Sequence, residues 1–99
     1  MLDTKYIDII RDIINHYGSK KQILQAIEEM SELTKELIKN INRNKTNENE
    51  IILEMADVMI MLKQLIEIYK IDKDKLLGAM EYKLLRQEKR IKEENQNVR

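Results

Sequence analysis

The chain of 99 residues contains no cysteine, no proline, no tryptophan and no phenylalanine, and it has only two glycines. The absence of cysteine excludes a disulfide framework, a thiolate metal site and a cysteine nucleophile. Nothing therefore speaks for an oxidising compartment, and we expect a cytoplasmic protein. Because the residues that interrupt helices are absent or rare, the composition is typical of an all-α protein.

A net charge is also absent, because 18 basic residues balance 18 acidic ones. This balance argues against broad electrostatic binding of nucleic acid or anionic lipid, so we expect neither as a partner. The most apolar run, residues 51–62, is too short and too acidic to span a bilayer. The length favours a single domain over residues 1–99, with a core over about 4–92.

Two amphipathic helices are predicted in the first half of the chain. The first covers about residues 4–17 and stops at Gly18. The second covers about residues 19–42, with Ser19 and Gln22 placed to form a capping box. Apolar residues at helical spacing predict the buried stripe of this second helix, namely Ile23, Ile27, Met30, Leu33, Leu37 and Ile41.

A short polar link leads to two further helices. Asn47 followed by Glu50 indicates a helix start, which predicts a third helix over about residues 48–70. The short link predicts that this helix forms an antiparallel hairpin with the second. Asp72 is expected to cap a fourth helix, which frays in residues 93–99.

The third helix is apolar around its whole circumference, whereas a surface helix has a single apolar stripe. Such a helix belongs at the centre of a bundle. A chain of this length offers it partners on two or three sides only, so we expect a second copy to cover the rest. The sequence therefore predicts a homo-oligomer, a dimer or a tetramer.

Two carboxylates nevertheless interrupt this apolar helix. Glu54 and Asp57 are three residues apart, about 60° around one helix, and can point into the same space. The second helix carries Glu29 and Glu32 at the same spacing, with Glu28 beside them. If the hairpin pairs these helices, the acids converge and repel one another unless a counter-charge is present.

A hard divalent cation is the simplest counter-charge. Carboxylate oxygens without histidine or cysteine select Mg²⁺ or Mn²⁺ over zinc or copper. Two other interpretations remain open. Glu28, Glu29 and Glu32 form an acidic face of a kind that is often merely solvated, and Glu54 and Asp57 are the right acids for a buried ion pair with Lys35, Lys63 or Arg86. A dimetal carboxylate bundle would need Glu-x-x-His motifs, which the single His16 does not supply.

The acids form the motifs EExxE (Glu28, Glu29, Glu32) and ExxD (Glu54, Asp57), separated by 21 residues. This ordered pair resembles the signature of the MazG-like, all-α nucleoside triphosphate pyrophosphohydrolases. The segments QAIEEMSELTKELIK and EIILEMADVMIMLKQL look like the two metal-binding helices of that family, and AMEYKLLRQEKRI is similar to its basic helix. The resemblance covers about residues 20–91.

The resemblance implies a four-helix MazG-like bundle completed by homo-oligomerisation. It implies an enzyme that hydrolyses the bond between the α and β phosphates of a nucleoside triphosphate, giving the monophosphate and pyrophosphate. Carried over by position, it gives Glu28 as the catalytic base. Lys83 and Arg86 are spaced as a basic stripe on the fourth helix, and with the resemblance we expect them to bind the outgoing pyrophosphate. The metal ligands that the resemblance implies are Glu29, Glu32, Glu54 and Asp57.

A second hypothesis comes from a different class of protein. In a non-catalytic helical oligomerisation or adaptor module, the third helix would be an interface and the acids would pair with lysines. The two hypotheses differ in one observable, because only a metal site gains stability from added Mg²⁺.

Overall fold

A computed structural model describes residues 4–43 and 46–97 of the chain. Every regular element within these ranges is an α-helix, so the predicted all-α class is confirmed. The elements are α1 (Ile7–Tyr17), α2 (Ser19–Asn42), α3 (Glu48–Ile68) and α4 (Lys73–Asn97). None of these four helices is both long enough and apolar enough to cross a membrane.

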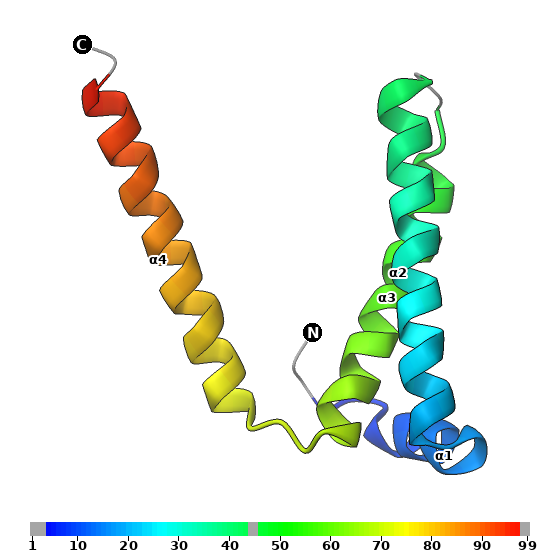
Figure 1. Ribbon diagram of the computed structural model, residues 1–99. Coiled ribbons are helices and arrows are strands. Elements are labelled where there is room, and N and C mark those ends of the chain that lie inside the picture. The colour runs from blue at the N-terminus through cyan, green and yellow to red at the C-terminus, as the bar shows by residue number, and fades with distance from the viewer. Residues whose placement is uncertain (1–3, 44–45, 98–99) are drawn as a thin grey trace.

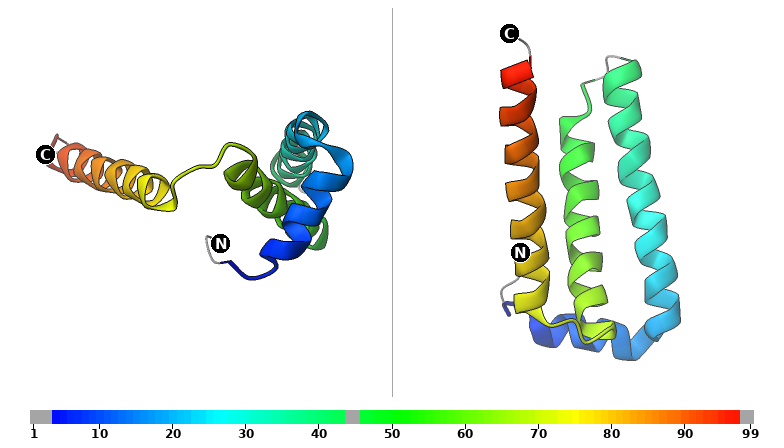
Figure 2. Two further views of the ribbon diagram at one scale, coloured as in Figure 1. Left: turned by 90° about the horizontal axis from the view of Figure 1, so that it is seen from below. Right: turned by 60° about the vertical axis from the view of Figure 1, so that its left-hand side comes forward.

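The centre of the molecule is a hairpin of α2 and α3, which run antiparallel and side by side (Figure 1). α1 crosses the base of the hairpin and packs against both of its helices (Figure 2). The antiparallel pairing predicted from the short polar link is therefore confirmed. It places the middle of α2 beside the middle of α3, where the two acidic motifs lie.

Gly18 is the C-terminal cap of α1 and also the N-terminal cap of α2. Its backbone has φ 92° and ψ 150°, a conformation that L side chains rarely adopt, and its amide donates a hydrogen bond of 2.8 Å to the carbonyl of Ile14. The predicted stop is confirmed, but the capping box is wrong. Ser19 is already helical, no side chain caps this start, and the Gln22 side chain is buried against α3 instead.

Of the boundaries next to Ile71, the start of α4 follows its predicted cap and the end of α3 departs from its predicted position. The Asp72 carboxylate accepts the amide of Asp74 at 2.9 Å, which caps α4 as expected. α3 ends two residues earlier than predicted because Lys70 adopts a left-handed conformation (φ 50°), and the Ile71 amide bonds the Ile66 carbonyl at 2.9 Å.

Asn47 occupies the predicted cap position of α3, but its side chain has a different role. It does not cap the helix. Its amide nitrogen donates 2.9 Å to the carbonyl of Glu36 on α2, and its oxygen accepts from Asn40 at 3.1 Å. The buried Asn47 side chain therefore ties the open end of the hairpin together.

The apolar stripe predicted for α2 is wrong as a buried surface of this chain. The buried residues of α2 are Gln22 and Ala26, whereas Ile41 at the end of the stripe is 77 % exposed. α2 turns polar residues such as Gln22 toward α3, so most of its larger apolar side chains are exposed. The buried apolar residues among those described are few, namely Ile10, Ala26, Met61 and Ile66.

α4 does not pack along the hairpin. It leaves the base after α3 and rises as a separate arm, which Figure 1 and the left-hand view of Figure 2 show apart from α2 and α3. None of its residues is buried. The helix continues past residue 93, where the sequence predicted fraying, to Asn97, and residues 98–99 lie outside the described residues.

Candidate metal centre

Three acids from the two helices of the hairpin converge. Glu29 on α2 and Glu54 and Asp57 on α3 each offer one carboxylate oxygen, and these three oxygens lie within 4.8 Å of one another. The geometry follows from helical periodicity: the spacing of three residues puts Glu54 and Asp57 on one side of α3, and the antiparallel pairing brings Glu29 opposite them. We refer to these three residues as the acidic triad.

Glu54 has the least favourable electrostatic environment of the acidic triad. Its Oε2 atom is buried and has no hydrogen-bond partner. Burial raises the pKa of its carboxyl above the ordinary value of 4.5, and the negative charges of Glu29 and Asp57 raise it further. An ionised Glu54 would therefore have neither solvent nor a hydrogen-bond donor at Oε2, a condition that a bound cation relieves.

The donor set of the acidic triad suits a hard divalent cation. Carboxylate oxygens are the ligands that Mg²⁺ and Mn²⁺ prefer, and Mg²⁺ typically binds one or two carboxylates and retains several waters. Glu29 and Glu54 are half-buried and Asp57 is exposed, so the triad is open to solvent on one side. The residues present therefore fit Mg²⁺ or Mn²⁺.

Glu32 does not join the acidic triad in this structure. Its Oε1 atom lies 3.3 Å from the ammonium of Lys35, one turn along the exposed side of α2. It is still close enough for its charge to raise the pKa of Glu54. The ion-pair alternative for Glu54 finds no support from Lys35, which pairs with Glu32, or from Arg86, whose guanidinium lies 5.7 Å from the Tyr82 ring centroid on α4.

Two polar residues near the acidic triad are not among the site residues that the sequence predicted. Gln25 donates its side-chain amide to Oε1 of Glu29 at 2.9 Å. Glu36, which pairs with Lys39 at 3.2 Å, also raises the pKa of Glu54. The sequence could have indicated both residues. Gln25 lies four residues before Glu29 and Glu36 lies four residues after Glu32, so all of them share one side of α2.

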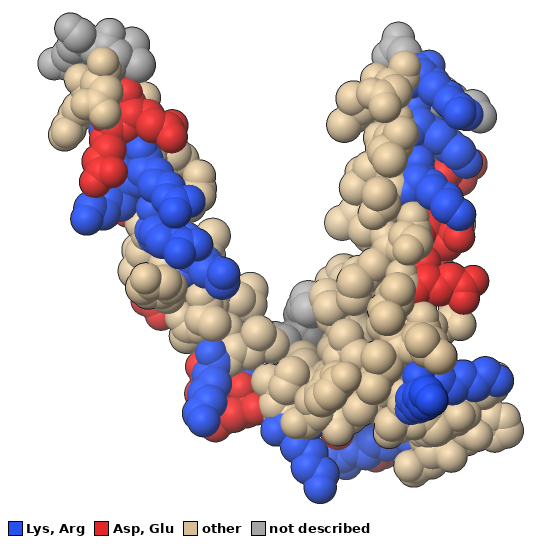
Figure 3. Space-filling model, in the orientation of Figure 1, with Lys and Arg blue, Asp and Glu red and all other residues tan. Residues whose placement is uncertain are grey.

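The remaining predicted site residues lie outside the acidic triad. Glu28 immediately precedes Glu29 on α2, but it is exposed and is not one of the three converging acids. Lys83 and Arg86 lie on the exposed arm α4, which makes no extended contact with the hairpin in the described part of the chain. Charged side chains are visible on both arms, with acidic ones gathered midway along the hairpin (Figure 3).

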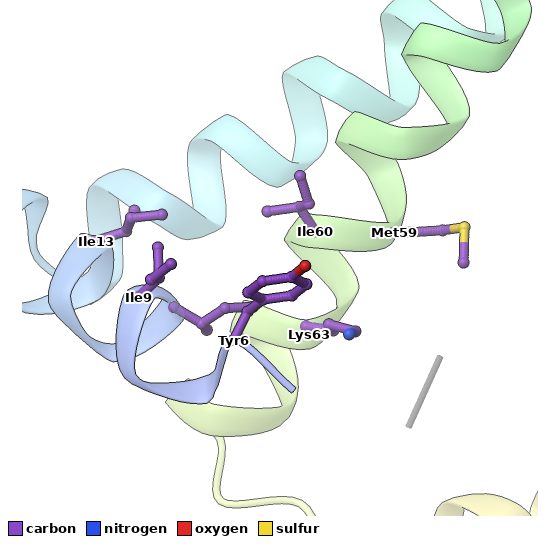
Figure 4. Close-up of a pocket in the computed structure, with 7 residues that line it drawn as sticks. Tyr6, Ile9, Ile13, Met59, Ile60 and Lys63 are labelled. Carbon is purple, nitrogen blue, oxygen red and sulfur yellow. The ribbon is translucent and has the colours of Figure 1, made fainter. Parts of the chain in front are cut away.

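An apolar cavity opens between α1 and α3, within one helical turn of Asp57 along α3. Its volume is about 390 Å³, in the range of small-molecule sites. Tyr6 stands across it from Ile60, and the Lys63 ammonium is its charged group (Figure 4). The complete lining consists of Tyr6, Ile9, Ile10, Ile13, Met59, Ile60 and Lys63.

Comparisons of the chain with protein-family models, with curated proteins and with solved structures found no match.

Proposed function

We propose that this protein is a Mg²⁺-dependent nucleoside triphosphate pyrophosphohydrolase of the MazG-like type, with Mn²⁺ as an alternative metal. One observation carries the proposal: carboxylate oxygens of Glu29, Glu54 and Asp57 lie within 4.8 Å of one another across two helices. The unpartnered Oε2 atom of Glu54 supports it, because a metal would satisfy this atom. The order and spacing of EExxE and ExxD in the sequence support the choice of reaction.

The chain's own residues divide the proposed work. Glu29, Glu54 and Asp57 hold the metal, which when bound neutralises triphosphate charge and acidifies a water. Glu32 joins them by leaving Lys35, since an exposed ion pair of this kind contributes only about 0 to 1 kcal/mol. Glu28, exposed beside the acidic triad, accepts the proton of the attacking water.

Lys83 and Arg86 bind the outgoing pyrophosphate in this proposal, which requires α4 to lie close to the acidic triad. Their helix stands apart from the acidic triad within one chain. Both residues therefore reach the substrate only when α4 packs on a hairpin, its own or that of a second copy. The apolar residues exposed on α4, such as Leu84 at 69 %, supply the surface for that packing, and we propose a homo-oligomer, a dimer or a tetramer.

The purified protein tests the reaction directly. With Mg²⁺ and a panel of standard and modified nucleoside triphosphates, we expect release of pyrophosphate and the monophosphate. Asp57→Asn removes one charged ligand while keeping the side-chain size, so activity should fall at least about 100-fold while the circular dichroism stays helical. Glu32→Gln should reduce activity as well.

Asp12→Asn is the matched control, because Asp12 is an exposed acid on α1 outside the acidic triad. Its activity should equal that of the unaltered chain. Full activity in both Asp57→Asn and Glu32→Gln would refute the assignment of the site.

A non-catalytic oligomerisation or adaptor module is the second candidate, and the exposed apolar surface of α2, α3 and α4 favours it. The two functions differ in their response to metal. A ligand that binds only the folded protein at 100 times its Kd stabilises it by about 2.7 kcal/mol. An unchanged melting temperature across a Mg²⁺ titration, together with no pyrophosphate release, would exclude the hydrolase and favour the adaptor module.

A further inference from the structure

The contact between α2 and α3 includes, beside the buried Ala26, an unusual polar seam. On α2, residues at alternating spacings of three and four are all polar, and on α3 the facing series contains two acids and one amide. This spacing is the one that normally places apolar residues between two packed helices. The seam consists of Gln22, Gln25, Glu29, Glu32 and Glu36 on α2 and of Glu54, Asp57, Met61 and Gln64 on α3.

The amides of the seam lie toward the base of the hairpin and are its most buried polar groups. Gln22 donates its side-chain amide to Oε1 of Gln64 at 2.8 Å. The two residues are 6 % and 2 % exposed, respectively. A slip of one helix along the other would leave both amides buried without a partner, at about 1 to 3 kcal/mol each.

This amide pair is in register with the acidic triad. Seven residues after Gln22 on α2 comes Glu29, and seven residues before Gln64 on α3 comes Asp57. Because the helices are antiparallel, the same two helical turns separate the amide pair from the acids on both sides. Whatever fixes Gln22 against Gln64 therefore fixes Glu29 against Asp57.

Gln25 acts within the same seam on one carboxylate. It is half-buried, and its side-chain nitrogen lies 2.9 Å from Oε1 of Glu29, one turn further along α2. A hydrogen bond to a metal-binding carboxylate from its neighbour sets the orientation of that carboxylate.

We propose that Gln22, Gln25 and Gln64 are positioning residues, of which Gln22 and Gln64 set the register of the hairpin and Gln25 orients Glu29 for the metal. The role of Gln25 rests on the proposed metal function. The register role does not, because it concerns the metal-free hairpin. Buried polar pairs fix register in other helical assemblies by the same means, at some expense of stability.

The register role is tested by replacing both amides together with Gln22→Leu and Gln64→Leu. Removing both partners leaves no unsatisfied group, so the folded protein should be as stable or more stable. The chain has no cysteine, so spin labels can be placed at Lys20→Cys on α2 and Asn49→Cys on α3, both exposed. Labelled protein is diluted with unlabelled protein to isolate distances within one chain.

We expect a single narrow distance in the parent chain. The double leucine variant should show a broadened distribution or one displaced by about one helical turn, roughly 5 Å. The control variant Gln87→Leu with Gln96→Leu replaces two exposed amides on α4 and should keep the parent distance. An unchanged narrow distance in the Gln22→Leu, Gln64→Leu protein would overturn the register role.

The orienting role is tested with Gln25→Met, which keeps the length of the side chain and removes the donor. The spin-label distance should be unchanged, because the register pair is intact. The Mg²⁺ concentration that gives half of the thermal stabilisation should rise about 10-fold or more. An unaltered Mg²⁺ midpoint would overturn this role.

Failure of the proposed metal function and failure of the role of Gln25 give different results. A parent chain without any Mg²⁺-dependent stabilisation refutes the proposed function and the orienting role together. A parent chain that responds to Mg²⁺, with a Gln25→Met variant that responds equally, refutes the orienting role alone. The spin-label distance decides the register role in either case, since it is measured without metal.

Discussion

Glu54 destabilises the metal-free hairpin, and it is also a proposed metal ligand. The residue lies in the most apolar helix of the chain, its Oε2 atom is buried without a hydrogen-bond partner, and two carboxylates are close by. Replacement by an apolar residue would relieve these penalties, so the folded metal-free protein gains nothing from this acid. An acid that destabilises its own hairpin is consistent with a ligand that is completed by a cation.

The raised pKa of Glu54 predicts how the stability of the metal-free protein varies with pH. Because the folded protein holds this proton more tightly than the unfolded chain, stability is lost as pH rises from 4.5 through the folded pKa. Glu54→Gln should remove this loss and be the more stable protein above that window. Urea unfolding at a series of pH values without metal measures the difference.

Glu50→Gln is the control for this prediction, since Glu50 is an exposed acid in the first turn of the same helix. It should leave the pH dependence of the parent chain in place. Excess Mg²⁺ should restore stability to the parent chain but not to Glu54→Gln. Equal pH dependence in Glu54→Gln and the parent would contradict the assigned environment of Glu54.

At the scale of the helices, local sequence signals placed two boundaries correctly, at Gly18 and at Asp72. Gly18 and Asp72 act as the sequence predicted, because a positive φ and a free carboxylate at a helix start are local properties. The capping box predicted at Ser19 and the cap position predicted at Asn47 are both wrong. In both, the polar side chain concerned, Gln22 or Asn47, bonds to the other helix of the hairpin, and this partner is set by tertiary contact.

Replacing each of the two glycines by alanine should change the stability of the fold in opposite directions. Gly18→Ala should destabilise the fold by about 1 to 3 kcal/mol, because φ is 92° and an added Cβ meets no atom within 4 Å, so the penalty is conformational. Gly78→Ala, in the interior of α4 with equal space, should raise helix stability by up to about 1 kcal/mol.

Urea denaturation followed by far-ultraviolet circular dichroism measures both substitutions. The pair is internally controlled, since the same methyl group is added to open space in each case. Equal effects of the two alanines would contradict the conformational penalty assigned to alanine at position 18.

At the scale of the molecule, the dominant feature is apolar surface without a partner inside one chain. α4 has no buried residue, and Leu77, Met80 and Leu84 repeat on it at helical spacing while remaining exposed. A helix in water draws most of its stability from packing of such a face. On the hairpin, Ile52, Leu53 and Met55 of α3 are exposed as well. These exposed apolar faces are the basis for the homo-oligomer proposed above.

The apolar stripe of α4 should control assembly. We expect the parent chain to form a dimer or tetramer at micromolar concentration, measured by size-exclusion chromatography with light scattering. Met80→Glu combined with Leu84→Glu should shift the mass toward the monomer and reduce the helix content, because charge is placed on the stripe.

Gln87→Glu adds the same charge to a polar position of the same helix and should keep the oligomer. A parent chain that is a stable, folded monomer would contradict the proposed assembly. It would also remove the route by which Lys83 and Arg86 of a second copy reach the acidic triad.

The sequence by itself determined the helical class, the four helices, the antiparallel hairpin and the meeting of Glu29 with Glu54 and Asp57. These follow from local propensity and from spacings of three and four residues, which act over one or two turns. Only the tertiary structure decided that Glu32 turns to Lys35, that the α2 stripe is exposed, and that Gln22 meets Gln64. Those outcomes depend on the rotation of each helix about its axis and on what covers its outer face, and no local pattern fixes either.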